Sequence, residues 1–257
     1  GRCKNVGAKL HRIEKDFDFK IKKESLEGTL FDLTTQRDRV LQLNDLVLSL
    51  LGKHQVENAS LAIEAILKLK NFGFKVSEEH IRQALKTAFF PGRFELIKRR
   101  ITQNPTQKDA EVSVDQRIVS RSSANIILDG AHNPTKMKAF LVTLKDLFPT
   151  QKKIFVVGFK FDKDIPNMLK QIVQVADKII VTEFNRSTDM SSNASIKISN
   201  LKSQISNLKY DKKIKVFAVK DSKKALDKAL AIEQYSSSTI IVVTGSLYLV
   251  GEIRNML

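Results

Sequence analysis

Short apolar runs alternate with helix-length segments along the second part of the chain. The runs, which are rich in β-branched residues, lie at residues 126–128, 154–157, 178–182, 214–219 and 239–244. The amphipathic segments between them lie at residues 134–148, 165–176, 194–208 and 221–232. Apolar strands separated by helices are typical of βαβ units, in which both faces of a parallel sheet are buried. The pattern therefore predicts a Rossmann-like, doubly wound α/β domain with a mostly parallel sheet over residues 93–257.

The first 90 residues have a different pattern. Polar and apolar residues alternate in "DFDFKIKKES" and "GTLFDLTT", which predicts short antiparallel strands. From residue 58 to residue 70 the apolar positions have helical spacing: Leu61, Ala62, Ala65, Ile66 and Leu69. Ser77, followed by two glutamates, predicts the start of a second helix that runs to about Thr87.

Pro91 and Gly92 interrupt this pattern within "FFPGRFE" and predict a domain junction. Residues 1–92 then form a first domain, and residues 93–257 form a second. Two polar stretches of the second domain, residues 103–125 and 186–195, lack the periodicity of buried elements and predict mobile loops.

Composition narrows the class of protein. The chain has 257 residues with 42% hydrophobic content, which is enough to build sizeable cores. Cys3 is the only cysteine, so the chain contains neither a disulfide framework nor a cysteine-based zinc site. The longest apolar runs have the length of strands and are far too short to span a membrane. These features predict a globular α/β protein of the reducing cytoplasm, without membrane association.

The net charge of +16 leaves two interpretations open. It could serve a polyanionic partner such as a nucleotide, a polycarboxylate or a nucleic acid. It could equally reflect a lysine-rich solvated surface. The lysines are scattered, without a basic cluster interleaved with aromatic residues, and this distribution argues against nucleic acid.

The stretch "ILDGAHNPTKMKAF" places polar residues directly after a predicted strand. In an open parallel sheet, ligands bind beyond the carboxyl ends of the strands. Asn133 can cap the following helix, and Pro134 suits its first turn. Asp129 could accept two hydrogen bonds from a ribose diol, or it could be an ordinary turn residue to which His132 pairs. The residues alone leave both interpretations open.

Several other chemistries have no motif in the sequence. There is no G-x-S-x-G nucleophile elbow, and the four histidines are widely separated, without H-E-x-x-H. The glycines of "TGSLYLVGE" do not form G-x-G-x-x-G. We therefore expect no serine hydrolase triad, no metal site and no dinucleotide redox site in these residues.

Five blocks together identify the chain as similar to one family. In order along the sequence they are "GKHQVENASLAIEAI", "FFPGRFE", "LDGAHNP", "FDKDI" and "TGSLYLVGEIR". They resemble folylpolyglutamate synthase and dihydrofolate synthase, a branch of the Mur ligase superfamily. The resemblance implies that ATP phosphorylates a carboxylate of a folate or dihydropteroate, and that L-glutamate then attacks the acyl phosphate to form an amide. It also implies that residues 1–92 are the end of a Mur-type ATP-binding domain.

The resemblance assigns a role to each matched residue. Asn58 matches an asparagine that reads the adenine edge, although it could also cap its helix. Arg93 matches the arginine that reaches the ATP phosphates and acts in catalysis. Asp129 matches the acid that holds the ribose. His132, as a second catalytic residue, and Ser246 match positions near the incoming glutamate, although Ser246 could simply start the last helix.

Other features of the family are missing from this sequence. The chain has no phosphate-binding loop of the type G-x-x-x-x-G-K-[ST]. The family's magnesium ligands and modified lysine also lie upstream of the matched blocks. We therefore expect a C-terminal fragment that is inactive alone, whose parent uses ATP and Mg²⁺ as a monomer.

Two alternatives are kept. A Mur-type peptide ligase is disfavoured because that branch usually carries tyrosine at the position of Gly130. A non-enzymatic polyanion-binding module would use the net charge instead. The sequence does not separate dihydrofolate synthase from folylpolyglutamate synthase or from a bifunctional enzyme.

Overall fold

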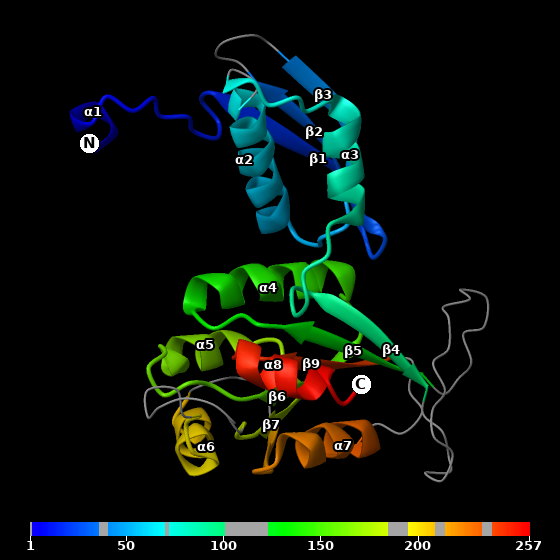
Figure 1. Cartoon of the computed structure of the whole chain (residues 1–257). Coiled ribbons are helices and arrows are strands. Elements are labelled where there is room, and N and C mark those ends of the chain that lie inside the picture. Colours follow the sequence, from blue (N-terminus) through cyan, green and yellow to red (C-terminus); the bar gives the residue numbers. More distant parts are fainter. Residues whose placement is uncertain are drawn as a thin grey trace. The chain divides into compact units, whose positions relative to one another are not determined.

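The computed structural model describes residues 2–35, 41–69, 72–100, 123–184, 195–208, 214–232 and 238–257. The chain divides into two compact units, residues 1–90 (unit 1) and residues 91–257 (unit 2). Each unit has its own sheet, shown in Figure 1.

Unit 1 contains a three-stranded antiparallel sheet of order β1-β2-β3. The strands are β1 (Phe17–Ser25), β2 (Gly28–Thr35) and β3 (Leu41–Leu48), and a short helix, α1 (Arg2–Asn5), precedes them. The two antiparallel strands predicted from alternation are confirmed as β1 and β2. Helices α2 (Lys53–Leu69) and α3 (Glu78–Thr87) lie side by side against the sheet in Figure 1. The core between sheet and helices consists of Phe17, Phe31, Leu33, Leu43, Leu46, Leu48, Val56, Ile63, Ile81 and Leu85.

Strand β3 was missed at the sequence level because a bulge breaks its alternation. Its register with β2 shifts between Phe31 and Leu33, and Asp45 has a positive φ of 55°. Leu43 and Leu46 are therefore both buried, although an uninterrupted strand would turn them to opposite faces.

The helix predicted from residue 58 begins earlier, at Lys53. Asn58 thus lies inside α2, and the interpretation of Asn58 as a helix cap is wrong. The second prediction is confirmed, since Ser77 caps α3 and its hydroxyl accepts the N–H of His80 at 3.2 Å. The His80 ring accepts the N–H of Ser77 in return, at 3.4 Å. This reciprocal pair satisfies two donors of the first turn.

Unit 2 contains a six-stranded sheet of order β4-β5-β9-β6-β7-β8 in the part of the chain that the structure describes. Its strands are β4 (Glu95–Arg100), β5 (Ser123–Asp129), β6 (Lys152–Val157), β7 (Lys178–Val181), β8 (Lys215–Ala218) and β9 (Thr239–Thr244). All neighbours pair in parallel except β4, which runs antiparallel to β5. The predicted doubly wound, mostly parallel α/β fold is confirmed.

The helices of unit 2 follow the parallel strands in turn. They are α4 (Pro134–Leu147), α5 (Ile165–Ile172), α6 (Ile198–Ser206), α7 (Ser222–Ile232) and α8 (Leu247–Arg254). Helix α4 packs against α5, and α7 packs against α8. Even-numbered side chains of β5 and β6, such as Ile126 and Ile154, meet α7 and α8 in one buried cluster. Helix α5 ends four residues before the predicted residue 176, because residues 173–175 form a turn.

Two further differences concern the edge of this sheet. Strand β4 was not predicted, because its sequence "ELIKRR" carries the charges of an edge strand with a single neighbour. Residues 123–125 belong to β5 and not to a loop, so that boundary was wrong. The rest of the first predicted loop, and residues 186–194 of the second, lie outside the described residues.

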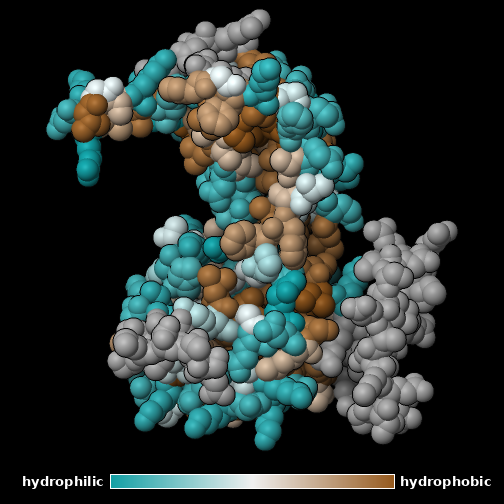
Figure 2. All heavy atoms as spheres, viewed as in Figure 1, coloured by the Kyte–Doolittle hydropathy of each residue, from teal (hydrophilic) through white to brown (hydrophobic). Residues whose placement is uncertain are grey.

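Hydrophilic residues are spread over both units on the face shown in Figure 2, with hydrophobic residues exposed between them. In the described ranges, no helix combines the length and apolar character needed to cross a bilayer.

Candidate functional site

The carboxyl ends of three strands of unit 2 meet at one edge of the sheet. Asp129 at the end of β5 pairs with Thr244 of β9, which also pairs with Val157 of β6. Strand β9 thus lies between β5 and β6, which follow one another along the chain. Such a topological switch point is where open α/β sheets bind ligands, because the loops diverge there.

Residues 91–94 form a turn beside this edge, which we call the Arg93 turn. Its Gly92 carbonyl accepts the N–H of Gly130 at 2.8 Å. The N–H of Phe94 donates to Oδ2 of Asp129 at 2.9 Å. These two bonds fasten the Arg93 turn to the end of β5, 35 residues away in sequence.

Asp129 is buried, with 6% of its surface exposed. Its second oxygen, Oδ1, accepts the N–H of Ala131 at 2.8 Å. Burial raises the pKa of Asp129 to about 6, while the two backbone N–H groups and the charges of Arg93 and Lys136 act in the opposite direction. The carboxylate therefore has a clear structural function, which is to join the Arg93 turn to the loop after β5.

His132 does not pair with Asp129, so that interpretation is wrong. Its Nδ1 instead hydrogen bonds with the carbonyl of Gly130 at 2.8 Å, which makes Nδ1 the protonated nitrogen. Nε2 lies 3.4 Å from Nζ of Lys136. Burial lowers the pKa of His132, and the charges of Lys136, Arg93 and Lys163 lower it further. The ring is therefore neutral near pH 7, and Nε2 is the atom that can accept a proton.

Ser246 follows β9 and starts α8. Its buried hydroxyl accepts the N–H of Tyr248 at 3.2 Å, so the simpler interpretation as a helix cap is confirmed. Gly245 before it has a φ of 103°, and a Cβ on Gly245 would lie 2.7 Å from the carbonyl oxygen of Gly158. A residue with a side chain would not fit between β9 and the loop after β6.

Gly130 is explained by its contact with α8. A Cβ on Gly130 would lie 2.6 Å from Cγ of Leu247 and 3.6 Å from the carbonyl oxygen of Gly92. A tyrosine at this position, as in the Mur branch, would need Leu247 to move. The structure thus gives a packing reason for the "DGAH" form of the motif.

The predicted site residues divide between the two units. Arg93, Asp129 and His132 come together in unit 2, because the residues on either side of Arg93 hydrogen bond with Asp129 and Gly130, and His132 hydrogen bonds with Gly130. Ser246 follows the neighbouring strand of the same sheet edge. Asn58 belongs to unit 1, where its side chain is exposed on α2 and donates to Gln55 Oε1 at 3.4 Å.

The loop of residues 161–164 has a clear structural role. Asp164 caps α5 and accepts the N–H of Asn167 at 3.4 Å. Lys163 Nζ donates to Asp162 at 3.0 Å, and this bond together with the charge of Lys160 lowers the pKa of Asp162.

Sequence reasoning missed Glu95 and Phe94. Glu95 accepts the N–H of Gly92 at 2.9 Å, and Phe94 has a positive φ of 46° beside the buried Asp129. Both lie inside the quoted block "FFPGRFE", but only the folded structure shows their contacts. An acid shortly after a Pro-Gly turn was the one signal available.

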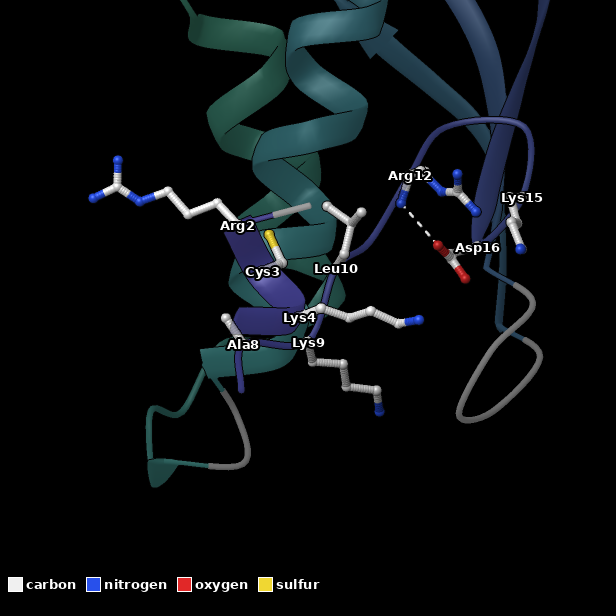
Figure 3. Close-up of a pocket in the computed structure, with 9 residues that line it drawn as sticks. All are labelled: Arg2, Cys3, Lys4, Ala8, Lys9, Leu10, Arg12, Lys15 and Asp16. Atoms are coloured by element: carbon white, nitrogen blue, oxygen red, sulfur yellow. Dashed lines mark hydrogen bonds between the residues drawn. The ribbon is translucent and has the colours of Figure 1, made fainter. Parts of the chain in front are cut away.

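Unit 1 has a separate basic hollow of about 540 Å³, shown in Figure 3. It lies between the N-terminal segment and the turn before β1, and basic side chains dominate its lining: Arg2, Lys4, Lys9, Arg12 and Lys15. The N–H of Arg12 donates to Asp16 Oδ2 at 2.9 Å. The sequence analysis did not single out this segment.

No group of three His, Cys, Asp or Glu side chains gathers to hold a metal within the described residues.

The raised pKa of Asp129 predicts that it makes stability fall as pH rises from about 4 to about 6. In this range the folded carboxyl keeps a proton that the unfolded chain, with a pKa near 3.8, has released, so higher pH favours unfolding. The resulting penalty at neutral pH is on the order of 3 kcal/mol.

Asp129→Asn does not titrate, so we expect this component of the pH dependence to vanish in that variant. The measurement is urea denaturation of both proteins at pH 4.5 and pH 7. An equal loss of stability in both proteins between the two pH values would refute the assignment to Asp129.

Comparison with known proteins matches this chain to one family. Residues 112–256 match a family model described as the C-terminal domain of dihydrofolate synthetase. The dihydrofolate synthase/folylpolyglutamate synthase of Bacillus subtilis is 29% identical over 219 residues, which are 83% of this chain and 41% of the relative.

Solved structures agree with the fold. Folylpolyglutamate synthase of Thermotoga maritima has 28% identity and a TM-score of 0.67, covering 99% of this chain and 49% of that chain. The Mycobacterium tuberculosis enzyme, solved with ADP and AMPPCP, has 21% identity and a TM-score of 0.72, covering 99% of this chain and 50% of that chain. The chain thus spans about half the length of these relatives.

Proposed function

The chain belongs to the dihydrofolate synthetase family, whose C-terminal domain it contains, and we propose that its protein is an ATP-dependent ligase that adds L-glutamate to a folate or a dihydropteroate. The observation that carries the proposal is the gathering of Arg93, Asp129 and His132 at the switch point of unit 2. The names of the Bacillus subtilis and Thermotoga maritima relatives support the reaction class.

Arg93 would act on the phosphates of ATP. In this reaction a carboxylate oxygen of the pterin substrate attacks the γ-phosphorus, and ADP leaves. A guanidinium is always charged and planar, so it suits the negative charge that develops on the transferred phosphoryl group. The Arg93 turn, fastened to Asp129 and Gly130, supplies a fixed backbone for that side chain.

His132 would act on the incoming glutamate. The amino group must lose a proton before its lone pair can attack the acyl carbon and displace phosphate. His132 is neutral, with Nδ1 engaged by Gly130, so Nε2 can accept that proton or a hydrogen bond from the amine. The nearby lysine charges keep the ring unprotonated, and they also attract the glutamate carboxylates.

Two further residues would bind the ribose of ATP and the incoming glutamate. Asp129 uses one lone pair on each oxygen for a backbone N–H, and the remaining lone pairs could accept the ribose hydroxyls. Ser246 uses its oxygen to cap α8, and its hydroxyl proton could be donated to a glutamate carboxylate.

We further propose that residues 1–92 are the end of the ATP-binding domain and residues 93–257 the C-terminal domain of this ligase. The protein would work as a cytoplasmic monomer on ATP, with Mg²⁺ bound by residues other than those described. The same proposal excludes nucleic acid and membrane partners.

The test measures ADP release by the full-length product of the gene that encodes these residues. ATP, magnesium and glutamate are supplied with dihydropteroate, with a reduced folate, or with no acceptor. Release that requires one of the pterins supports the ligase and identifies its acceptor. Release that requires a nucleotide-linked peptide instead would point to a Mur-type ligase, and no release with any acceptor would refute the proposal.

Asn58 gives an independent prediction for the nucleotide. If its amide reads the adenine edge, Asn58→Ala should raise KM for ATP about tenfold, because the edge of the bound adenine would lose its hydrogen bonds to the amide. Stability should change little, since Asn58 is exposed within α2 and alanine favours helices. The neighbouring Glu57→Ala serves as the control, and equal KM values in both variants would remove Asn58 from the binding site.

A further inference from the structure

The backbone on both sides of Arg93 lies in the left-handed region. Gly92 has a φ of 68° and Phe94 a φ of 46°. Residues with a Cβ rarely adopt such values, and they keep them only where surrounding contacts impose them. The Phe94 ring is buried with its centroid 5.5 Å from that of Phe140, which provides one such contact. The strained segment therefore coincides with the arginine of the proposed site.

Two side chains outside the proposed site fasten this turn. Glu95 Oε2 accepts the N–H of Gly92 at 2.9 Å. Arg254 at the end of α8 donates from Nε to Glu95 Oε1 at 2.9 Å and to Oε2 at 3.1 Å. The Glu95 side chain is only 9% exposed, so its carboxylate forms a nearly buried link between the Arg93 turn and α8. Hydrogen bonds between charged groups are stronger than neutral ones.

Packing strengthens the same link. A Cβ on Gly92 would lie 2.8 Å from Cγ1 of Val250, so the turn already touches α8 closely. Helix α8 thus holds the Arg93 turn both through side-chain packing and through Arg254. It is also the helix that begins at Ser246.

We propose that Glu95 and Arg254 are positioning residues that hold the Arg93 turn and thereby fix the Cα–Cβ bond from which the Arg93 side chain extends. The inference rests on the proposed action of Arg93 on ATP. Arg254 fixes the rotamer of Glu95, and Glu95 fixes Gly92. Since Asp129 holds Phe94 from the other side, Arg93 is left with only its side-chain torsions.

The test compares Arg254→Gln with Glu252→Gln in the full-length gene product. Glu252 lies on the same helix and accepts a hydrogen bond from Ser222 Oγ at 2.9 Å, so its loss removes a similar contact without touching the Arg93 turn. We expect Arg254→Gln to lower kcat about fivefold at nearly unchanged KM for ATP, because Arg93 acts on the transferring phosphoryl group and the lost charge pair is partly exposed. Arg254→Lys should restore part of kcat, because it keeps the charge.

Hydrogen exchange at the amides of Gly92 and Gly130 gives a second readout. We expect about fivefold faster exchange in Arg254→Gln and no change in Glu252→Gln. An unchanged kcat, or the same fall in kcat in both variants, would overturn the positioning role. If the wild-type protein uses no ATP, the proposed function fails. Hydrogen exchange then decides alone whether Arg254 holds the Arg93 turn, and unchanged exchange in Arg254→Gln would refute that role.

Discussion

Arg93→Ala is expected to lower pterin-dependent ADP release by the full-length gene product by about 10³-fold. Removing a cation that stabilises a transferring phosphoryl group typically has an effect of this size. Arg93→Lys keeps the charge but loses the planar donor fork, and an intermediate loss of about 10- to 100-fold is expected.

Arg93→Ala also has a readout that does not depend on turnover. The charge of Arg93 lowers the pKa of both Asp129 and His132, so both pKa values should rise in Arg93→Ala. Titration of the His132 ring by NMR measures this directly. The control is Lys228→Ala on α7, where Nζ lies 4.7 Å from the centroid of the Phe217 ring and removal should change neither activity nor these pKa values. Wild-type ADP release by Arg93→Ala would sink the proposed role.

Gly245→Ala is expected to destabilise the chain by about 3 kcal/mol. A residue with a Cβ at a φ of 103° is strained, and the added carbon would lie 2.7 Å from the carbonyl oxygen of Gly158 and 2.7 Å from Cε1 of Phe159. Both neighbours are buried at the end of the central strands, so neither can move aside easily. A loss of this size lowers Tm by about 6–12 °C in a unit of this length.

Gly251→Ala is the matched control for this prediction. Gly251 lies within α8, only six residues further along the chain, and a Cβ there would meet nothing within 4 Å. Alanine is the better helix former, so we expect a gain of up to about 1 kcal/mol. Thermal unfolding of both variants is the measurement, and a Tm for Gly245→Ala at or above that of Gly251→Ala would contradict the packing argument.

The sequence determined most of the elements of unit 2, with the exception of β4, and the identity of its motifs. The apolar run at residues 239–244 located β9 at Thr239–Thr244 as predicted, and Asn133 located the start of α4 as its cap. These signals are local, because a strand buried on both faces must be apolar throughout and a helix start needs an acceptor for its free N–H groups. The five sequence blocks likewise indicated the family that the comparisons then showed.

Only the tertiary structure decided how these elements form a site. Strand order places β9 between β5 and β6, which brings Thr244 beside Asp129, and pairing of segments so distant in sequence leaves no local pattern. The carboxylate of Asp129 was predicted to hold a ribose or to pair with His132; the pairing with His132 is wrong, and the structure adds its hydrogen bonds to the N–H groups of Phe94 and Ala131. Its raised pKa follows from burial, which depends on every element packed around it. The residue types and their spacing thus named the chemistry, and long-range packing set its geometry and its protonation.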